Sequence, residues 1–189
     1  MNYMMIRTDD MLNGDGLRVV LFCTACDHYC NNCHNQETWQ ASNGMLFDDN
    51  AKLKIFEELE KDYINGLTLS GGDPLNKNNL NGIYALCKEV KNKYPNKTIW
   101  IYSGYKWFDI FYEQGYVYPQ IDVGGFSYKY TDTDRLMRQK IISLCDVFVD
   151  GKFVEELADV KYPWAGSTNQ NVIDVKKSFA ENKVALWSE

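Results

Sequence analysis

Short apolar runs alternate with longer amphipathic stretches along most of this chain. The apolar runs are rich in β-branched and aromatic residues, which is typical of buried strands, and they cover residues 18–22, 66–70, 98–102 and 146–151. The amphipathic stretches predict helices over residues 48–62, 78–93, 106–113 and 134–144. In the first of these helices the expected buried stripe consists of Leu53, Phe56, Leu59 and Tyr63. The tail, residues 171–189, predicts a strand, a short helix and a last apolar strand.

The alternation of strands and helices predicts βαβ units with right-handed crossovers around a parallel sheet. We therefore assign the chain to the α/β class, as a partial parallel β/α barrel, because it has too few βα units to close a full one. A length of 189 residues is enough for one domain with a substantial core, and we expect residues 1–189 to form a single domain.

Three unusual loops follow the predicted strands. They are the cysteine loop of residues 23–34, the Gly71-Gly72-Asp73-Pro74 turn and the Ser103-Gly104-Tyr105 turn. In open parallel sheets, the chemistry sits at the carboxyl ends of the strands. The sequence therefore predicts that the three loops meet at one edge of the sheet and form the functional site.

The charge and the N-terminal composition argue against nucleic-acid binding, secretion and a membrane location. The formal net charge is −6 and no basic stripe is present, so we expect no binding to nucleic acid. The N-terminus lacks the pattern of a secretory signal, and no run of about 18 apolar residues predicts a membrane helix. We therefore expect a cytoplasmic protein, in which thiols stay reduced.

The stretch "CTACDHYCNNC", residues 23–33, holds four of the six cysteines. A reducing compartment disfavours a disulfide knot, which leaves a zinc clip or an iron–sulfur cluster. If Cys23 belongs to the strand before the loop, Cys26, Cys30 and Cys33 remain as a C-x3-C-x2-C triplet. Three thiolates can hold three corners of a cubane cluster and leave the fourth iron open to another ligand. A zinc clip that uses all four cysteines is the alternative.

Residues 26–33, "CDHYCNNC", resemble the signature of the radical S-adenosylmethionine superfamily. The flanking stretches "NGDGLRVVLF" and "HNQETW" are similar to the glycyl-radical-enzyme activases, and "LTLSGGDPL" is similar to their methionine-amine-binding loop. Three further stretches, "IWIYSGY", "DVFVDGKF" and "WAGSTNQ", resemble the small branch that activates anaerobic ribonucleotide reductase. The resemblance runs from about Asn13 to Asp174. It departs from the usual pattern at Ala25, Asn32 and Ala165, and the last of these puts in doubt a charge contact from the C-terminal loop.

The resemblance implies two cofactors, a [4Fe-4S] cluster and S-adenosylmethionine. The metal ligands would be Cys26, Cys30 and Cys33. The residues that bind S-adenosylmethionine would be Asn32, Cys33, His34, Ser70, Gly71, Gly72, Asp73 and Ser103, with Asp73 as an acceptor for the ammonium group. No catalytic residue is expected beyond the cluster and its ligands. His28 could donate a hydrogen bond to a cluster sulfur, and Arg18 is expected to form a structural salt bridge, with Asp15 or with a buried carboxylate.

The implied reaction is the reductive cleavage of S-adenosylmethionine to methionine and a 5′-deoxyadenosyl radical. This radical would generate a glycyl radical on the large subunit of anaerobic ribonucleotide reductase, with a reduced flavodoxin-type protein as the electron donor. The alternatives are an activase of another glycyl-radical enzyme, of the pyruvate formate-lyase type, or a small radical enzyme that acts on a free metabolite. A zinc-stabilised binding module without catalysis is the alternative from a different class.

Overall fold

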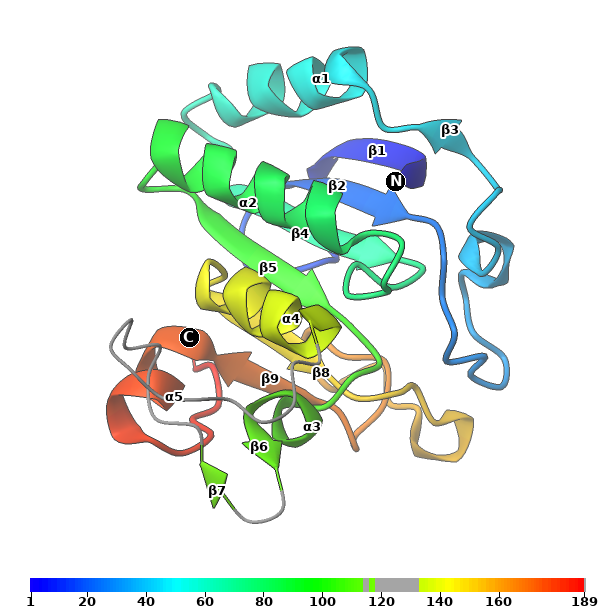
Figure 1. Ribbon diagram of the computed structural model, residues 1–189, viewed down its shortest axis with the longest axis vertical. Coiled ribbons are helices and arrows are strands. Elements are labelled where there is room, and N and C mark those ends of the chain that lie inside the picture. Colours follow the sequence, from blue (N-terminus) through cyan, green and yellow to red (C-terminus); the bar gives the residue numbers. More distant parts are fainter. Residues whose placement is uncertain (114–115, 118–132, 189) are drawn as a thin grey trace.

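Four parallel strands form the centre of the sheet, as the sequence predicts. The computed structural model describes residues 1–113, 116–117 and 133–188, and Figure 1 shows its course. The central strands are β2 (Arg18–Cys23), β4 (Gly66–Gly71), β5 (Thr98–Tyr102) and β8 (Val147–Asp150). They pair in this order and in parallel. All four coincide with predicted strands to within one residue at either end.

Three antiparallel strands extend the sheet at its edges. β1 (Asn2–Asp10) pairs with β2, β3 (Met45–Leu46) pairs with β1, and β9 (Asn171–Asp174) pairs with β8. The order of the seven strands is β3-β1-β2-β4-β5-β8-β9, so the sheet is open, with β3 and β9 at its two edges. The α/β class and the parallel core are therefore confirmed. A separate two-stranded pair consists of β6 (Tyr112–Glu113) and β7 (Tyr116–Val117).

Two features of the edges differ from the prediction. The sequence analysis did not predict β1, because most of its residues are only half-buried or exposed and it lacks a continuous apolar run. The expected last apolar strand forms only a single bridge, between Leu186 and Ile173, and Glu189 lies outside the described residues. Both segments depend on a neighbouring strand for their conformation.

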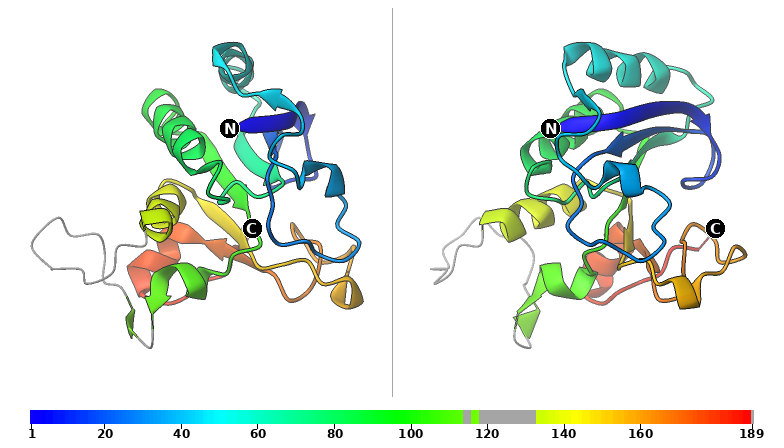
Figure 2. Two further views of the ribbon diagram at one scale, coloured as in Figure 1. Left: turned by 45° about the vertical axis from the view of Figure 1, so that its right-hand side comes forward. Right: turned by 90° about the vertical axis from the view of Figure 1, so that its right-hand side faces the viewer.

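Helices cover one face of the sheet, as Figure 2 shows for α1, α2 and α4. The helices are α1 (Asp49–Leu59), α2 (Leu80–Lys93), α3 (Trp107–Phe111), α4 (Thr133–Ser143) and α5 (Val175–Glu181). Two short 3-10 helices are η1 (Gln36–Thr38) and η2 (Glu155–Leu157). None of the helices described here is long and apolar enough to cross a membrane.

The predicted stripe of the first helix is partly wrong. Leu53 is 54% exposed and Tyr63 is 55% exposed, and Tyr63 lies beyond the end of α1. Phe56 and Leu59 are buried as predicted, together with Ala51 and Ile55. Ala51, Ile55 and Leu59 are spaced four residues apart, so the buried face of α1 is rotated relative to the predicted stripe.

The two faces of the sheet carry different cores. On the helix side, Leu21, Leu69 and Ile101 are fully buried against the helices. On the other side, Trp100 packs edge-to-face against Trp164 and Trp187. Each fully buried apolar side chain of this size contributes roughly 1.5–3 kcal/mol. The helix-free face is therefore closed near the starts of the strands by aromatic residues from the C-terminal segments.

Arg18 lies fully buried on this second face, and the expected salt bridge is wrong. Within the described residues, its guanidinium donates only to neutral oxygens: Thr68 Oγ1 at 2.7 Å, Leu67 O at 2.9 Å, the carbonyl and hydroxyl of Thr98, and the backbone carbonyl of Asp15. Burial lowers the pKa of Arg18 to about 10, so it stays charged at neutral pH. The side chain thus joins β2 to β4 and β5 through charge-assisted hydrogen bonds.

Candidate functional site

The cysteine loop leaves the sheet at the carboxyl end of β2. Its backbone is held by hydrogen bonds from Cys26 N to Trp39 O at 3.0 Å and from Cys33 N to Cys30 O at 3.2 Å. Three of its residues have positive φ angles without being glycine: Ala25 at 71°, Tyr29 at 49° and Asn32 at 51°. Such angles are unfavourable for side chains other than Asn. The loop is therefore held in a tightly coiled path by its surroundings.

The six cysteines are all free, and they fall into two groups. Cys23, Cys87 and Cys145 are at most 1% exposed and lie in the core beneath the helices. Cys23 is the last residue of β2, and burial raises the pKa of its thiol far above the usual range. The thiols of the second group, Cys26, Cys30 and Cys33, lie on the loop. The loop cysteines are the more accessible set.

Backbone N–H groups point at each of the three loop thiols. Burial raises the pKa of Cys26 to about 11, and hydrogen bonds from the N–H groups of His28 and Tyr29 oppose this. Burial also raises the pKa of Cys30, against a hydrogen bond from the N–H of Phe153. The N–H of Asn35 donates to Cys33 Sγ at 3.4 Å. N–H donors to sulfur stabilise thiolates and tune iron–sulfur clusters, so this donor set fits a cluster.

The loop does not have the arrangement of a site for one metal ion. Among the described residues, no three His, Cys, Asp or Glu side chains are placed so that they could hold a single ion. Structural zinc requires four ligands that converge on one point. Cys23 is fully buried as the last residue of β2, which leaves three thiols on the loop. Three thiols fit a cluster with one open iron better than a zinc clip that uses all four cysteines.

The Gly-Gly-Asp turn at the end of β4 packs directly on the cysteine loop. Gly72 N donates to Cys23 O, and Asp73 N donates to Ala25 O, both at 2.8 Å. Gly71 has a φ of +100°, and a Cβ atom there would lie 2.6 Å from Cys23 O. Only glycine allows both this angle and this close approach. The prediction that these two loops meet is confirmed.

Asp73 is a buried acceptor that joins all three loops. Its carboxylate accepts hydrogen bonds from Ser103 Oγ at 2.8 and 3.0 Å, Leu75 N at 2.8 Å and Gly104 N at 3.3 Å. It also makes a short contact with His28 Nε2. The side chain is 1% exposed. Both oxygens thus have partners within the protein, and the predicted role of Asp73 toward the ammonium of S-adenosylmethionine stays a prediction.

His28 points at Asp73, where the sequence analysis expected a cluster sulfur. Its ring packs edge-to-face on Tyr105, with the ring centroids 4.8 Å apart. Arg138 also packs over the Tyr105 ring, with its Cζ 4.2 Å from the ring centroid, and donates to the Tyr105 hydroxyl at 3.2 Å. His28 therefore connects the cysteine loop to the loop after β5. Sequence reasoning missed this because Asp73 is 45 residues away along the chain.

Asn79 is a second residue that the sequence analysis missed. Its side-chain amide donates to Thr24 O at 2.7 Å and to Asp73 O at 2.9 Å, and it is 1% exposed. It stands at the N-cap position of α2 without capping the helix. A polar residue just before a helix is usually interpreted as a cap, so this role could not be recognised from the sequence.

The remaining predicted residues lie around these loops. Ser70 is nearly buried and pairs with Phe22 in the sheet. Asn32 and His34 are exposed on the far side of the cysteine loop, and the His34 ring lies 5.9 Å from that of Phe153. The structure therefore gathers Cys26, Ser70, Gly71, Gly72, Asp73 and Ser103 near the strand ends. It places Asn32 and His34 farther out, toward the loop after β8.

A cavity of about 440 Å³ opens beside His34 on the helix-free face. The residues that line it include Asn13, Tyr102, Tyr162 and Trp164. The hydroxyl of Tyr102 is buried and has no hydrogen-bond partner among the described residues. A pocket of this size with aromatic walls and one unpaired hydroxyl is typical of a binding site.

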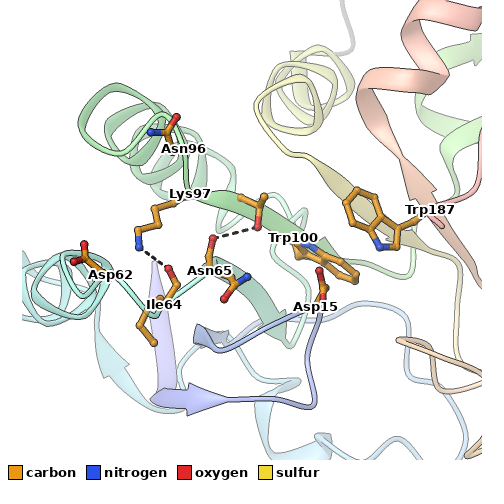
Figure 3. A pocket seen from close by; sticks show the side chains of 9 residues that line it. Asp15, Asp62, Ile64, Asn65, Asn96, Lys97, Trp100 and Trp187 are labelled. Carbon is orange, nitrogen blue, oxygen red and sulfur yellow. Dashed lines mark hydrogen bonds between the residues drawn. The ribbon is translucent and has the colours of Figure 1, made fainter. Parts of the chain in front are cut away.

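A second cavity, of about 330 Å³, lies at the opposite end of the sheet (Figure 3). It is lined by Asp15, Asp62, Trp100 and Trp187, among others, and none of the predicted site residues lies there. Lys97 Nζ crosses it to donate to Ile64 O at 2.5 Å. This cavity is located where the strands begin, on the side away from the cysteine loop.

Comparisons with known proteins agree with this site. Residues 12–173 match the family model of a 4Fe-4S single cluster domain. A protein of Haemophilus influenzae is 37% identical over 172 residues, which cover 90% of this chain and 96% of that protein. A protein of Enterobacteria phage T4 is 38% identical over 172 residues, covering 91% and 93%. A protein of Escherichia coli K12 is 33% identical over 174 residues, covering 91% and 97%.

All three relatives are named anaerobic ribonucleoside-triphosphate reductase-activating protein. The similarity covers nearly the whole of each chain and includes all three loops of the site. The chain therefore belongs to the 4Fe-4S single cluster domain family and, within it, to the anaerobic ribonucleoside-triphosphate reductase-activating proteins.

Proposed function

We propose that this protein is a radical S-adenosylmethionine enzyme that generates a glycyl radical on the large subunit of an anaerobic ribonucleotide reductase. The observation that carries the proposal is the set of three free thiols on the loop that follows β2, packed against the Gly-Gly-Asp turn, in a chain that matches this family along nearly its whole length. In this proposal the open sheet is the partial β/α barrel of the radical S-adenosylmethionine type, and residues 1–189 form one domain.

The three loop cysteines would hold the cluster. Cys26, Cys30 and Cys33 would each bind one iron as thiolates, and their backbone N–H donors would stabilise the sulfur charge. Bound together, the reduced cluster and S-adenosylmethionine supply the one-electron chemistry that the side chains cannot perform. The role of the chain is to bind, to orient and to exclude water.

The loops after β4 and β5 would bind S-adenosylmethionine. Ser70, Gly71 and Gly72 would face its methionine end, because glycine backbone allows a ligand to approach closely. Asp73 would keep Ser103 and His28 in place through the hydrogen bonds described above. On the outer side of the loop, Asn32, Cys33 and His34 would contact the adenosine portion.

The cavity beside His34 would admit the glycine-bearing segment of the reductase. A polypeptide segment offers backbone carbonyls, and Tyr102 has a buried hydroxyl that lacks an acceptor. Three exposed apolar residues stand at the rim: Met11, Leu12 and Val160. They match the apolar contacts of a protein interface. A reduced flavodoxin-type protein in the cytoplasm would deliver the electron.

The test is an anaerobic reconstitution with iron and sulfide, followed by reduction and EPR with and without S-adenosylmethionine. We expect a reduced-cluster signal whose shape changes when S-adenosylmethionine is added. With the purified large subunit of an anaerobic ribonucleotide reductase, we expect a glycyl-radical doublet. A Cys30→Ala variant is the control and should give neither signal.

Two outcomes would contradict the proposal. Cleavage of S-adenosylmethionine without a doublet on the reductase would favour another glycyl-radical enzyme or a free metabolite as the substrate. A colourless protein that takes up zinc instead of the cluster would favour a zinc-stabilised binding module without catalysis.

A further inference from the structure

The loop after β8 contacts the cysteine loop from its exposed side. We call residues 151–157 the clasp loop; it follows β8 and includes η2. Glu155 accepts hydrogen bonds on both carboxylate oxygens, from Asn31 Nδ2 at 2.7 Å and from Asn32 Nδ2 in a short contact. These partners are 123 and 124 residues away in the sequence. Figures 1 and 2 show the two loops side by side at the same end of the molecule.

The clasp loop also reaches one of the predicted cluster ligands. The backbone N–H of Phe153 donates to the Cys30 thiol, and the charged side chain of Lys152 lies near it. The Phe153 ring lies 5.9 Å from the ring of His34. The segment from Cys30 to His34 is therefore touched by the clasp loop at Cys30, at both asparagines and at His34.

The stretch 164–170, "WAGSTNQ", holds the clasp loop in place. Ser167 Oγ accepts from Val154 N at 3.2 Å, Asn169 Nδ2 donates to Lys152 O at 2.8 Å, and Gln170 Nε2 donates to Gly151 O at 2.8 Å. Ser167 is fully buried. The side-chain oxygen of Gln170, Oε1, accepts hydrogen bonds from Gly166 N and Ser167 N. Residues 164–170 thus support the clasp loop through side-chain hydrogen bonds to its backbone.

We infer that the clasp loop is a positioning element for the cluster, in which Glu155 fixes the segment between the second and third cysteine ligands and Phe153 donates to the second. The inference rests on the proposed function only in that Cys26, Cys30 and Cys33 hold the cluster. Asn31 and Asn32 are exposed, and Asn32 has a positive φ angle. Glu155 supplies the contact that keeps this segment in its coiled conformation.

The charge of Glu155 has a second effect. A carboxylate beside the ligand loop disfavours the addition of an electron to the cluster, because like charges repel. Removal of this charge should therefore make the cluster easier to reduce. A role in folding alone would not change the reduction potential, so the potential distinguishes the two roles.

The experiment compares Glu155→Ala with Glu156→Ala in the full chain, each reconstituted anaerobically. Glu156 is the next residue of η2 and is also exposed, so it controls for a lost surface carboxylate. In Glu155→Ala we expect iron to be released to a chelator about tenfold faster than in the unmodified protein, the size of effect seen when outer partners of metal ligands are removed. The midpoint potential without S-adenosylmethionine should move to more positive values. Glu156→Ala should match the unmodified protein in both measurements.

A Glu155→Gln variant separates charge from hydrogen bonding. It keeps one acceptor oxygen, so its iron release should be slower than that of Glu155→Ala, while its potential should still shift. The inference is overturned if Glu155→Ala matches the Glu156→Ala control in either measurement. Both measurements need only the cluster, without S-adenosylmethionine or the reductase. A chain that assembles no cluster at all would contradict the proposed function instead.

Discussion

At the scale of single residues, accessibility and hydrogen bonding separate the cysteines that can bind iron from those that cannot. Cys23 lies in the middle of the core, with neighbours on β1 and β4. The thiols of Cys26, Cys30 and Cys33 each face a backbone N–H group at the strand ends. A metal ligand must lose its proton, which a buried apolar environment opposes. The two groups of thiols should therefore respond differently to substitution.

Substitution of each cysteine by alanine tests this division. We expect Cys26→Ala, Cys30→Ala and Cys33→Ala to lose the cluster, measured as iron and sulfide content after anaerobic reconstitution. Cys23→Ala should retain the cluster and lose roughly 1–2 kcal/mol of unfolding free energy through a small cavity. A cluster lost from Cys23→Ala, at a temperature where the protein remains folded, would make Cys23 a ligand.

Asp73→Asn tests the buried acceptor that joins the three loops. The amide group cannot accept hydrogen bonds on both of its ends, so at least one of the donors Ser103, Leu75 N or Gly104 N would lose its partner. We expect the free energy of unfolding to fall by about 2–4 kcal/mol, measured by denaturant titration of the metal-free protein. The control is Asp27→Asn, at an exposed carboxylate with a single hydrogen bond from Asn76. Equal stability of the two variants would show that Asp73 does not join the loops.

At the scale of secondary-structure elements, the carboxylate of Asp146 connects helices α2 and α5 to the sheet. Asp146 stands just before β8 and accepts from Lys91 of α2 at 2.5 Å, Lys176 of α5 at 2.7 Å and Ile99 N of β5 at 2.8 Å. Burial alone would raise the pKa of Asp146, but these hydrogen bonds outweigh it and the pKa is lowered. A carboxylate with a lowered pKa stabilises the fold when it is ionised.

Asp146→Asn should therefore destabilise the protein in a pH-dependent way. Near pH 7 we expect a loss of about 2 kcal/mol in unfolding free energy. The contribution of a group with a lowered folded pKa is complete above its unfolded pKa, about 3.9 for Asp, and is lost as the pH falls through the folded pKa. The difference between the variant and the unmodified protein should thus shrink below about pH 4. Asp49→Asn, at a fully exposed carboxylate 3.6 Å from Lys52, should have no measurable effect at any pH.

At the scale of the whole molecule, the two ends of the open sheet differ: one is packed with aromatic side chains and the other carries the candidate site. Aromatic residues close the helix-free face where the strands begin, and the three loops occupy the end where the strands finish. Arg18 holds β2, β4 and β5 together on the face of the sheet that none of the described helices covers. Arg18 thus joins the three strands that lead to the loops, near the ends where these strands begin.

Arg18→Met should lower the unfolding free energy by at least about 3 kcal/mol, because several buried oxygens would lose their donors. The measurement is denaturant unfolding of the metal-free protein. Arg7→Met is the control, because Arg7 is a half-exposed arginine of β1 that forms a salt bridge with Asp10. A loss no larger than that of Arg7→Met would mean that backbone pairing alone fixes the strands.

Much of the fold could be predicted from local pattern. The four parallel strands and the helices between them follow from apolar periodicity, which depends on neighbours in the sequence. The phase of α1 was wrong because the stripe could be drawn through Leu53 or through Ile55, and only the contacts with the sheet select one. The strand β1 was missed because its partly exposed residues take their conformation from pairing with β2.

The sequence by itself determined the cysteine triplet, the glycine turn beside it and the parallel order that brings both to one edge. Each of these depends on residue types at short spacing, so no distant contact is needed to recognise them. The tertiary structure alone decided that His28 points at Asp73, that Arg18 bonds neutral oxygens and that the clasp loop holds Asn31 and Asn32. These contacts join residues from 45 to 124 positions apart, and the path of the folded chain sets such distances.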